Sequence, residues 1–166
     1  MKNKKAFTFI ELLVILSIIS IVAFLTLPRL ATVIKPKRIE AFAYRLRDTL
    51  NYLNETAILK KKVYLFVFDL EEKSYYFRVS ERGNLEGKVK DRYLKKVDFP
   101  DFLEIKMLKM QPGGEIREGR MIVPFTPKGI LYPFLIDLSD GEREYVLEGN
   151  VVNSKIELKI LKKEAY

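Results

Sequence analysis

The chain has 166 residues and a formal net charge of +8, a length that fits one domain with an ordinary core. It contains no Cys and no His, which excludes zinc sites, thiol nucleophiles and His-dependent catalytic triads. The positive charge favours anionic partners only weakly, because Lys and Arg alternate with Glu and Asp along most of the chain, as on any solvated surface.

A short basic leader, residues 1–6, precedes an apolar run over residues 7–27 in which Glu11 is the single charged residue. As an α-helix this run would be about 30 Å long, which matches the hydrocarbon core of a bilayer. A single helix also satisfies its own backbone hydrogen bonds in lipid. We therefore predict a transmembrane helix over residues 7–27.

Glu11 lies near the start of this run, where a carboxylate is costly to insert and usually has a partner. No Lys or Arg lies one helical turn away, so two interpretations remain open. Either a partner comes from elsewhere, or the carboxylate lies at the interface and reaches water. Basic residues flank both ends of the run, so counting charges leaves its orientation open.

The leader, the small residue Ala6, the segment Phe7-Thr-Phe-Ile-Glu11 and the later Pro28 together resemble the class III signal of type IV pilins and pseudopilins. The resemblance implies that a prepilin peptidase cleaves the bond between Ala6 and Phe7, and that Phe7 is then N-methylated. Glu11 takes the place of the family's assembly glutamate, and Pro28 that of the proline where the helix bends. One departure is Ala6, because the family normally has Gly there.

The resemblance also implies a partner for Glu11. If the amine of Phe7 on a neighbouring subunit reaches Glu11, both charges are compensated in lipid and one axial stagger between subunits is favoured. The implied partners are the prepilin peptidase, other pilin-like subunits, inner-membrane lipid and a possible secreted cargo. The implied location is a single-pass inner-membrane protein with a cytoplasmic N-terminus and a periplasmic domain, incorporated into a pseudopilus.

The next segment, residues 28–61, reads as a continuation of the helix, interrupted at Pro28 and Pro36. Its apolar residues recur in steps of three and four and so trace one stripe of a helix. The stripe consists of Ile39, Phe42, Leu46, Leu50, Leu53 and Ala57. We expect this stripe to pack on the domain that follows.

Residues 62–166 are predicted to form a β-rich domain of six to eight antiparallel strands, with residues 80–100 irregular. Asp140-Gly141 marks a hairpin, and Pro133 indicates an edge position or a bulge in its strand. The expected strands are 63–70, 74–79, 102–110, 120–126, 130–138, 143–147 and 155–160. The fold class is therefore α+β, with a long N-terminal helix packed on an antiparallel β-sheet or β-sandwich-like domain.

Three segments of this region, residues 55–69, 122–129 and 134–138, resemble the H-type minor pseudopilin of type II secretion. That class joins the helix to a β-sandwich-like domain and has a Phe-x-Pro-x-Gly turn before a hairpin. The resemblance implies a minor pseudopilin, a structural subunit of a pseudopilus that helps to export folded proteins, and not an enzyme.

Two alternatives remain. One is a minor pilin of a type IV pilus that binds DNA, for which Lys159–Lys163 is the compact basic candidate. The other is a membrane-anchored periplasmic binding protein or enzyme. The acidic residues from Asp137 to Glu144 are interpreted as surrounding a hairpin turn, because they lack the spacing of a calcium loop. We predict no catalytic residues, no metal and no cofactor.

Overall fold

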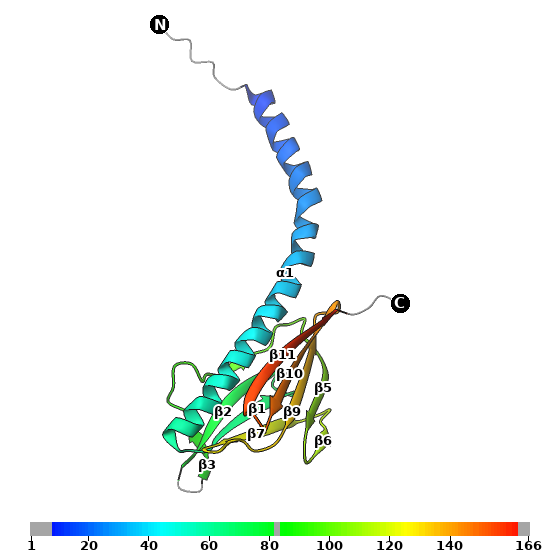
Figure 1. The fold of residues 1–166 in the computed structure, drawn as a ribbon. Helices are drawn as coiled ribbons and strands as arrows, with labels where there is room; N and C mark the ends of the chain where they lie inside the picture. The colour runs from blue at the N-terminus through cyan, green and yellow to red at the C-terminus, as the bar shows by residue number, and fades with distance from the viewer. Residues whose placement is uncertain (1–7, 82–83, 163–166) are drawn as a thin grey trace. The chain divides into compact units, whose positions relative to one another are not determined.

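The chain divides into two compact units, Met1–Lys37 and Arg38–Tyr166. One helix, α1 (Phe9–Lys60), runs from the first unit into the second (Figure 1). The computed structural model describes residues 8–81 and 84–162, and their side chains except at 26–36, 81, 84–86 and 88. The predicted boundaries of the leader and of the transmembrane segment stay predictions.

Helix α1 is continuous through Pro28 and Pro36, so the predicted interruptions of the helix at these two residues are wrong. A proline inside a helix removes one backbone hydrogen bond and crowds the preceding turn, but a long helix can carry that local loss. The bend predicted at Pro28 stays a prediction.

Eleven strands follow α1 within the described residues. Three of them were not expected from the sequence, namely β3 and β4 inside the predicted irregular segment and the short strand β6, and β8 was expected only as the start of the strand over residues 130–138. Their bounds are β1 Tyr64–Asp69, β2 Ser74–Glu81, β3 Asn84–Lys88, β4 Val97–Asp98, β5 Glu104–Met110, β6 Gly114–Glu115, β7 Arg120–Thr126, β8 Gly129–Ile130, β9 Phe134–Ser139, β10 Arg143–Asn150 and β11 Lys155–Lys162.

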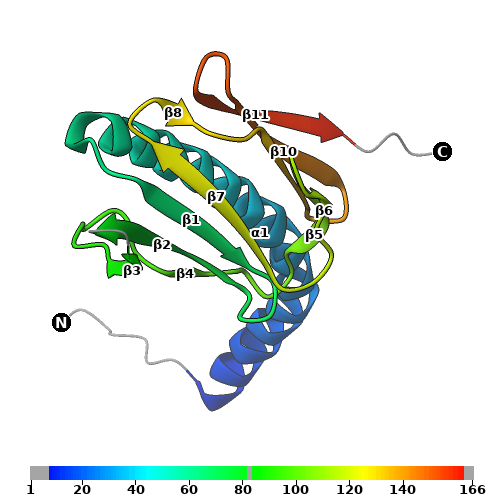
Figure 2. The ribbon, with the colours of Figure 1, turned by 90° about the horizontal axis from the view of Figure 1, so that it is seen from below.

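The strands form two antiparallel sheets (Figures 1 and 2). The first sheet has the order β3-β2-β1-β7-β8, with β4 paired to the edge of β2, and the second has the order β11-β10-β9-β5-β6. The α+β fold class, a long helix packed on antiparallel sheets, is confirmed.

The strand predicted over residues 130–138 is in fact two strands in different sheets. Its first part, β8, pairs with β7 in the first sheet, and its second part, β9, pairs with β10 and β5 in the second. The chain crosses between the sheets at Leu131–Pro133, where Tyr132 is 36% exposed. Pro133 cannot donate to a strand ladder, so the ladder ends where it stands.

The second half of α1 packs on both sheets. All six residues of the predicted stripe are buried, five of them with no exposed surface and Phe42 with 7%. The Phe42 ring lies 5.8 Å from that of Tyr75 on β2, whereas Asn51 bonds the backbone of Ile156 on β11. Figure 2 shows the second half of α1 lying across the sheet that contains β1, β2 and β7. One core therefore joins the helix and both sheets.

Candidate functional site

The start of α1 is held by a side-chain cap. The hydroxyl of Thr8 accepts a hydrogen bond from the backbone N–H of Glu11 at 3.3 Å, and the carbonyl of Thr8 accepts one from Leu12 at 3.2 Å. Thr8 is therefore the N-cap and Glu11 the third helical residue, the spacing of a capping box. A carboxylate in the first turn of a helix is stabilised by the helix dipole.

This cap gives Glu11 a local reason to be where it is, besides the assembly role that the sequence predicts. Thr8 was missed by sequence reasoning, although its signal, Thr followed by Glu three positions later, is present. Of the other predicted site residues, Ala6 and Phe7 lie outside the described residues. Pro28 lies within α1.

The apolar side chains of α1 between Phe9 and Leu25 are exposed to a degree that is unusual for a folded protein. Phe9 is 78% exposed, Leu16 51% and Phe24 79%. Two polar side chains in this stretch bond to the helix itself, since the hydroxyls of Ser17 and Ser20 each donate to a carbonyl one turn back at 2.8 Å. This stretch therefore offers mainly hydrocarbon to its surroundings.

Within the part of the chain that the structure describes, no helix is both long and apolar enough to cross a membrane.

The acidic residues between β9 and β10 form a turn. Asp140 Oδ1 accepts hydrogen bonds from the backbone N–H groups of Glu142 at 2.9 Å and Arg143 at 2.7 Å, and Oδ2 accepts one from the Tyr145 hydroxyl at 2.8 Å. Burial alone would raise the pKa of Asp140, but these bonds outweigh it and lower that pKa. The interpretation as a hairpin is confirmed by the pairing of β9 with β10.

The C-terminal basic candidate is partly neutralised. Lys159 Nζ lies 2.7 Å from a carboxylate oxygen of Glu148 on the neighbouring strand. Lys162 is exposed, and Lys163 lies outside the described residues. This stretch therefore presents fewer free cations than its sequence indicates.

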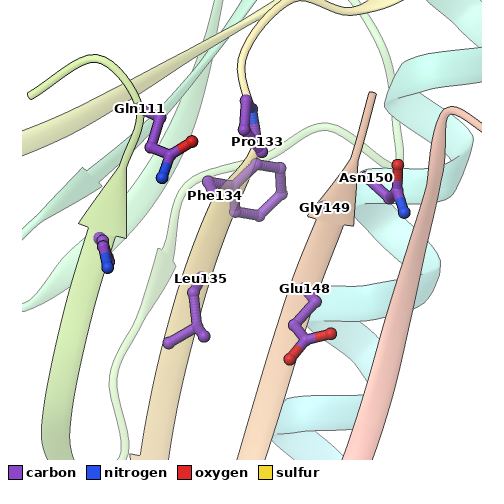
Figure 3. Close-up of a pocket in the computed structure, with 8 residues that line it drawn as sticks. Gln111, Pro133, Phe134, Leu135, Glu148, Gly149 and Asn150 are labelled. Atoms are coloured by element: carbon purple, nitrogen blue, oxygen red, sulfur yellow. The ribbon is translucent and has the colours of Figure 1, made fainter. Parts of the chain in front are cut away.

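A hollow of about 340 Å³ lies at one end of the second sheet (Figure 3). The Phe134 ring on β9 lies over Gly149 on β10, and a Cβ at Gly149 would lie only 2.1 Å from that ring. Gly149 is therefore required for close packing. Glu148 is the one carboxylate among the lining residues, and it pairs with Lys159, so the hollow offers no free acid for chemistry.

Two comparisons with known proteins found similarities. Residues 1–27 match the family model of the prokaryotic N-terminal methylation motif. The fold is similar to the minor pseudopilin EpsH from the type 2 secretion system of Vibrio cholerae. The TM-score is 0.55 at 14% sequence identity, over 76% of this chain and 98% of that one. The chain has the fold of a minor pseudopilin. No curated protein sequence matches.

The resemblance to type IV pilins and pseudopilins, and to the H-type minor pseudopilin in particular, is confirmed by these two comparisons. The matched motif contains Ala6, Phe7 and Glu11. The individual roles predicted for these three residues stay predictions.

Proposed function

We propose that this protein is a minor pseudopilin, a structural subunit of a type II secretion pseudopilus that helps to export folded proteins. One observation carries the proposal: a pilin-like methylation motif at residues 1–27 and the fold of a minor pseudopilin occur in the same chain. Neither feature alone would support it, since the motif is shared by many filament proteins and the fold says nothing about anchoring.

In this proposal residues 1–6 are a leader removed by the prepilin peptidase, and residues 7–27 anchor the protein in the inner membrane with its domain in the periplasm. The exposed apolar side chains between Phe9 and Leu25 support this, because such a surface needs an apolar environment. The bonded hydroxyls of Ser17 and Ser20 support it as well, because unsatisfied polar groups are costly in lipid.

Glu11 is proposed to pair with the methylated amine of Phe7 on a neighbouring subunit. The capping by Thr8 supports this, since it fixes where the helix begins and hence the height at which the Glu11 side chain leaves the helix. An unpaired charge in lipid is costly, so the pair stabilises the one axial stagger between subunits that brings the two charges together.

The mature N-terminus tests the processing step. We expect the intact mass and N-terminal sequencing of the native protein to give a chain that starts at N-methyl-Phe7. Ala6→Trp should accumulate as the uncut precursor in the membrane, whereas Ala6→Gly should be cleaved at least as well as the wild type. A mature chain that starts beyond Leu27 would overturn the pilin-like reading and favour a conventional signal peptide.

The role of Glu11 is tested by assembly. Glu11→Ala should reach the membrane at the wild-type level but be strongly depleted from sheared filaments, because the charge pair is lost. Glu55→Ala is the matched control, since Glu55 is an exposed carboxylate on the second half of α1. Equal incorporation of both variants would show that Glu11 serves only as a helix-capping residue.

A further inference from the structure

Between β3 and β4 the chain leaves the first sheet and forms a segment, residues 89–96, that we call the basic loop. β3 pairs with β2 from Arg78 onward, and β4 pairs with β2 at Ser74 and Tyr75. The basic loop thus passes the edge of β2 between these two pairings. Four of its eight residues are cations with exposed side chains, namely Lys90, Arg92, Lys95 and Lys96.

The basic loop is fixed to α1 by two inward-facing residues. The Asp91 side chain is 10% exposed, accepts hydrogen bonds from the Tyr52 hydroxyl at 3.0 Å and the Tyr93 N–H at 2.9 Å, and lies 3.7 Å from Lys60 Nζ. Burial raises the pKa of Asp91, but these partners outweigh it and lower that pKa overall. Leu94 is 4% exposed and belongs to the core. The cations are therefore presented by a well-anchored segment.

A hollow lies on each side of the basic loop. The larger, of about 720 Å³, is lined by Arg78, Lys90, Lys95, Lys96 and Arg120 together with two carboxylates. The smaller, of about 500 Å³, lies against α1 and is lined by Arg45, Arg92 and Lys95 together with Tyr93 and one carboxylate, that of Asp48. Lys95 lines both hollows, so the two form one cationic region divided by the loop.

Some of these cations already have partners. Lys96 pairs with Glu72 at 2.7 Å, and Arg120 pairs with the buried Asp69 at 2.7 Å. Among the side chains that the structure describes, no carboxylate forms an ion pair with Arg78, Lys90 or Lys95, and Arg78 lies 5.4 Å from the centre of the Tyr76 ring. The described lining of the larger hollow therefore has an excess of positive charge, with five cations against two carboxylates.

We propose that the basic loop, together with Arg78 and Arg45, binds an acidic segment of another protein. Fixed cations around a hollow favour binding of a carboxylate-bearing chain. The loop loses little conformational entropy on binding, because it is already anchored. Glu72 and Asp91 lie among the cations and would repel a continuous phosphate backbone, whereas a polypeptide can place its acids away from them. This inference does not depend on the proposed anchoring or processing.

The test measures binding by the full chain in a non-ionic detergent. The probes are a fluorescent peptide of alternating Glu and Ala and an oligothymidylate of the same charge, each titrated at low and at physiological salt. We expect Lys90→Glu/Lys95→Glu to weaken peptide binding about tenfold, because two attractions become repulsions. Lys90→Gln/Lys95→Gln should give a smaller loss.

The control is Lys109→Glu/Lys128→Glu, which makes the same change in net charge at exposed positions outside the basic loop. It should leave peptide binding within twofold of the wild type. An equal loss in both double variants, or no peptide binding at all, would overturn the proposal. Tighter binding of the oligothymidylate that depends on Lys90 and Lys95 would also overturn it, since the partner would then be a nucleic acid. None of these outcomes bears on the mature N-terminus.

Discussion

The two halves of α1 use apolar residues in opposite ways. Between Phe9 and Leu25 the large apolar side chains are exposed, whereas between Ile39 and Ala57 they form one stripe that the sheets cover. A helix with a single apolar stripe can bury it within its own chain, but one that is apolar all round needs an apolar environment from outside. The first half therefore leaves its apolar surface uncovered, as the proposed membrane anchor would, whereas the second half buries its stripe by internal packing.

The largest difference between the two halves is expected when one leucine in each is replaced by alanine and the effect on stability is compared. Leu50→Ala removes a side chain with no exposed surface, and we expect the free energy of unfolding of the domain to fall by about 2–5 kcal/mol. Leu16→Ala, at a position 51% exposed, should change it by less than about 0.5 kcal/mol. Urea unfolding followed by Tyr fluorescence measures both. Similar losses would mean that the first half also packs within the chain.

A charge placed in the first half of α1 should weaken membrane insertion and leave the stability of the domain unchanged. Ile18→Lys puts a cation at a site 55% exposed and should cost about 2.5–3.5 kcal/mol of membrane insertion, while urea unfolding of the domain stays unchanged. The fraction retained in membranes after alkaline carbonate extraction measures the effect, with Ile18→Leu as the control. Full retention of the Lys variant would argue against the proposed membrane anchor.

The second half of α1 is also joined to β11 by hydrogen bonds of Asn51. These should contribute less to the free energy of unfolding than the apolar stripe does. The Asn51 amide donates to the carbonyl of Ile156 at 3.1 Å and accepts from its N–H at 3.0 Å, so it replaces a missing neighbour of edge strand β11. Asn51→Ala should lower the free energy of unfolding by about 1–3 kcal/mol. It should also speed hydrogen exchange at Ile156, while the exposed control Glu55→Ala should do neither.

The sequence predicts features that depend on short spacings better than those that depend on distant partners. The stripe from Ile39 to Ala57 and the Asp140-Gly141 hairpin were predicted correctly, because helix period and turn chemistry are local. The pairing of Asn51 with Ile156 joins residues 105 positions apart, and no local pattern encodes it. The switch between sheets at Pro133 was read as an edge or bulge for the same reason.

The candidate sites were also predictable where they depend on neighbouring residues and not where they depend on distant ones. The motif around Phe7 and Glu11 is compact in sequence and was found there. The basic loop was read as part of an irregular polar segment, although four cations within eight residues are a visible signal. What the sequence did not contain was the burial of Asp91 and Leu94, which decides that these cations face outward from a fixed segment.

Acid sensitivity should belong to the folded unit, and Asp69 provides a small, specific test. Asp69 has no exposed surface, accepts hydrogen bonds from the N–H groups of Glu71 and Glu72, and bonds Arg120 at 2.7 Å. Burial raises the pKa of Asp69, but these donors and the Arg120 charge outweigh it, so the folded pKa lies below the ordinary value of 3.8. The stabilisation is therefore complete above that value and is lost as the pH falls through the folded pKa.

Asp69→Asn should remove this pH-dependent part and keep an oxygen that can accept the backbone hydrogen bonds. At neutral pH we expect a loss of about 1 kcal/mol, a modest figure because Arg120 is 45% exposed and its pairing is screened by water. The difference in the free energy of unfolding between wild type and variant should become smaller as the pH falls below 3.8. Urea unfolding at neutral and at acid pH measures this difference. A difference that stays constant with pH would show that the charge of Asp69 contributes nothing to stability. Packing and the backbone hydrogen bonds alone would then hold the turn. In that case acid sensitivity would have to come from other carboxylates, with Asp91 and Asp140, whose pKa values are also lowered, the next to test.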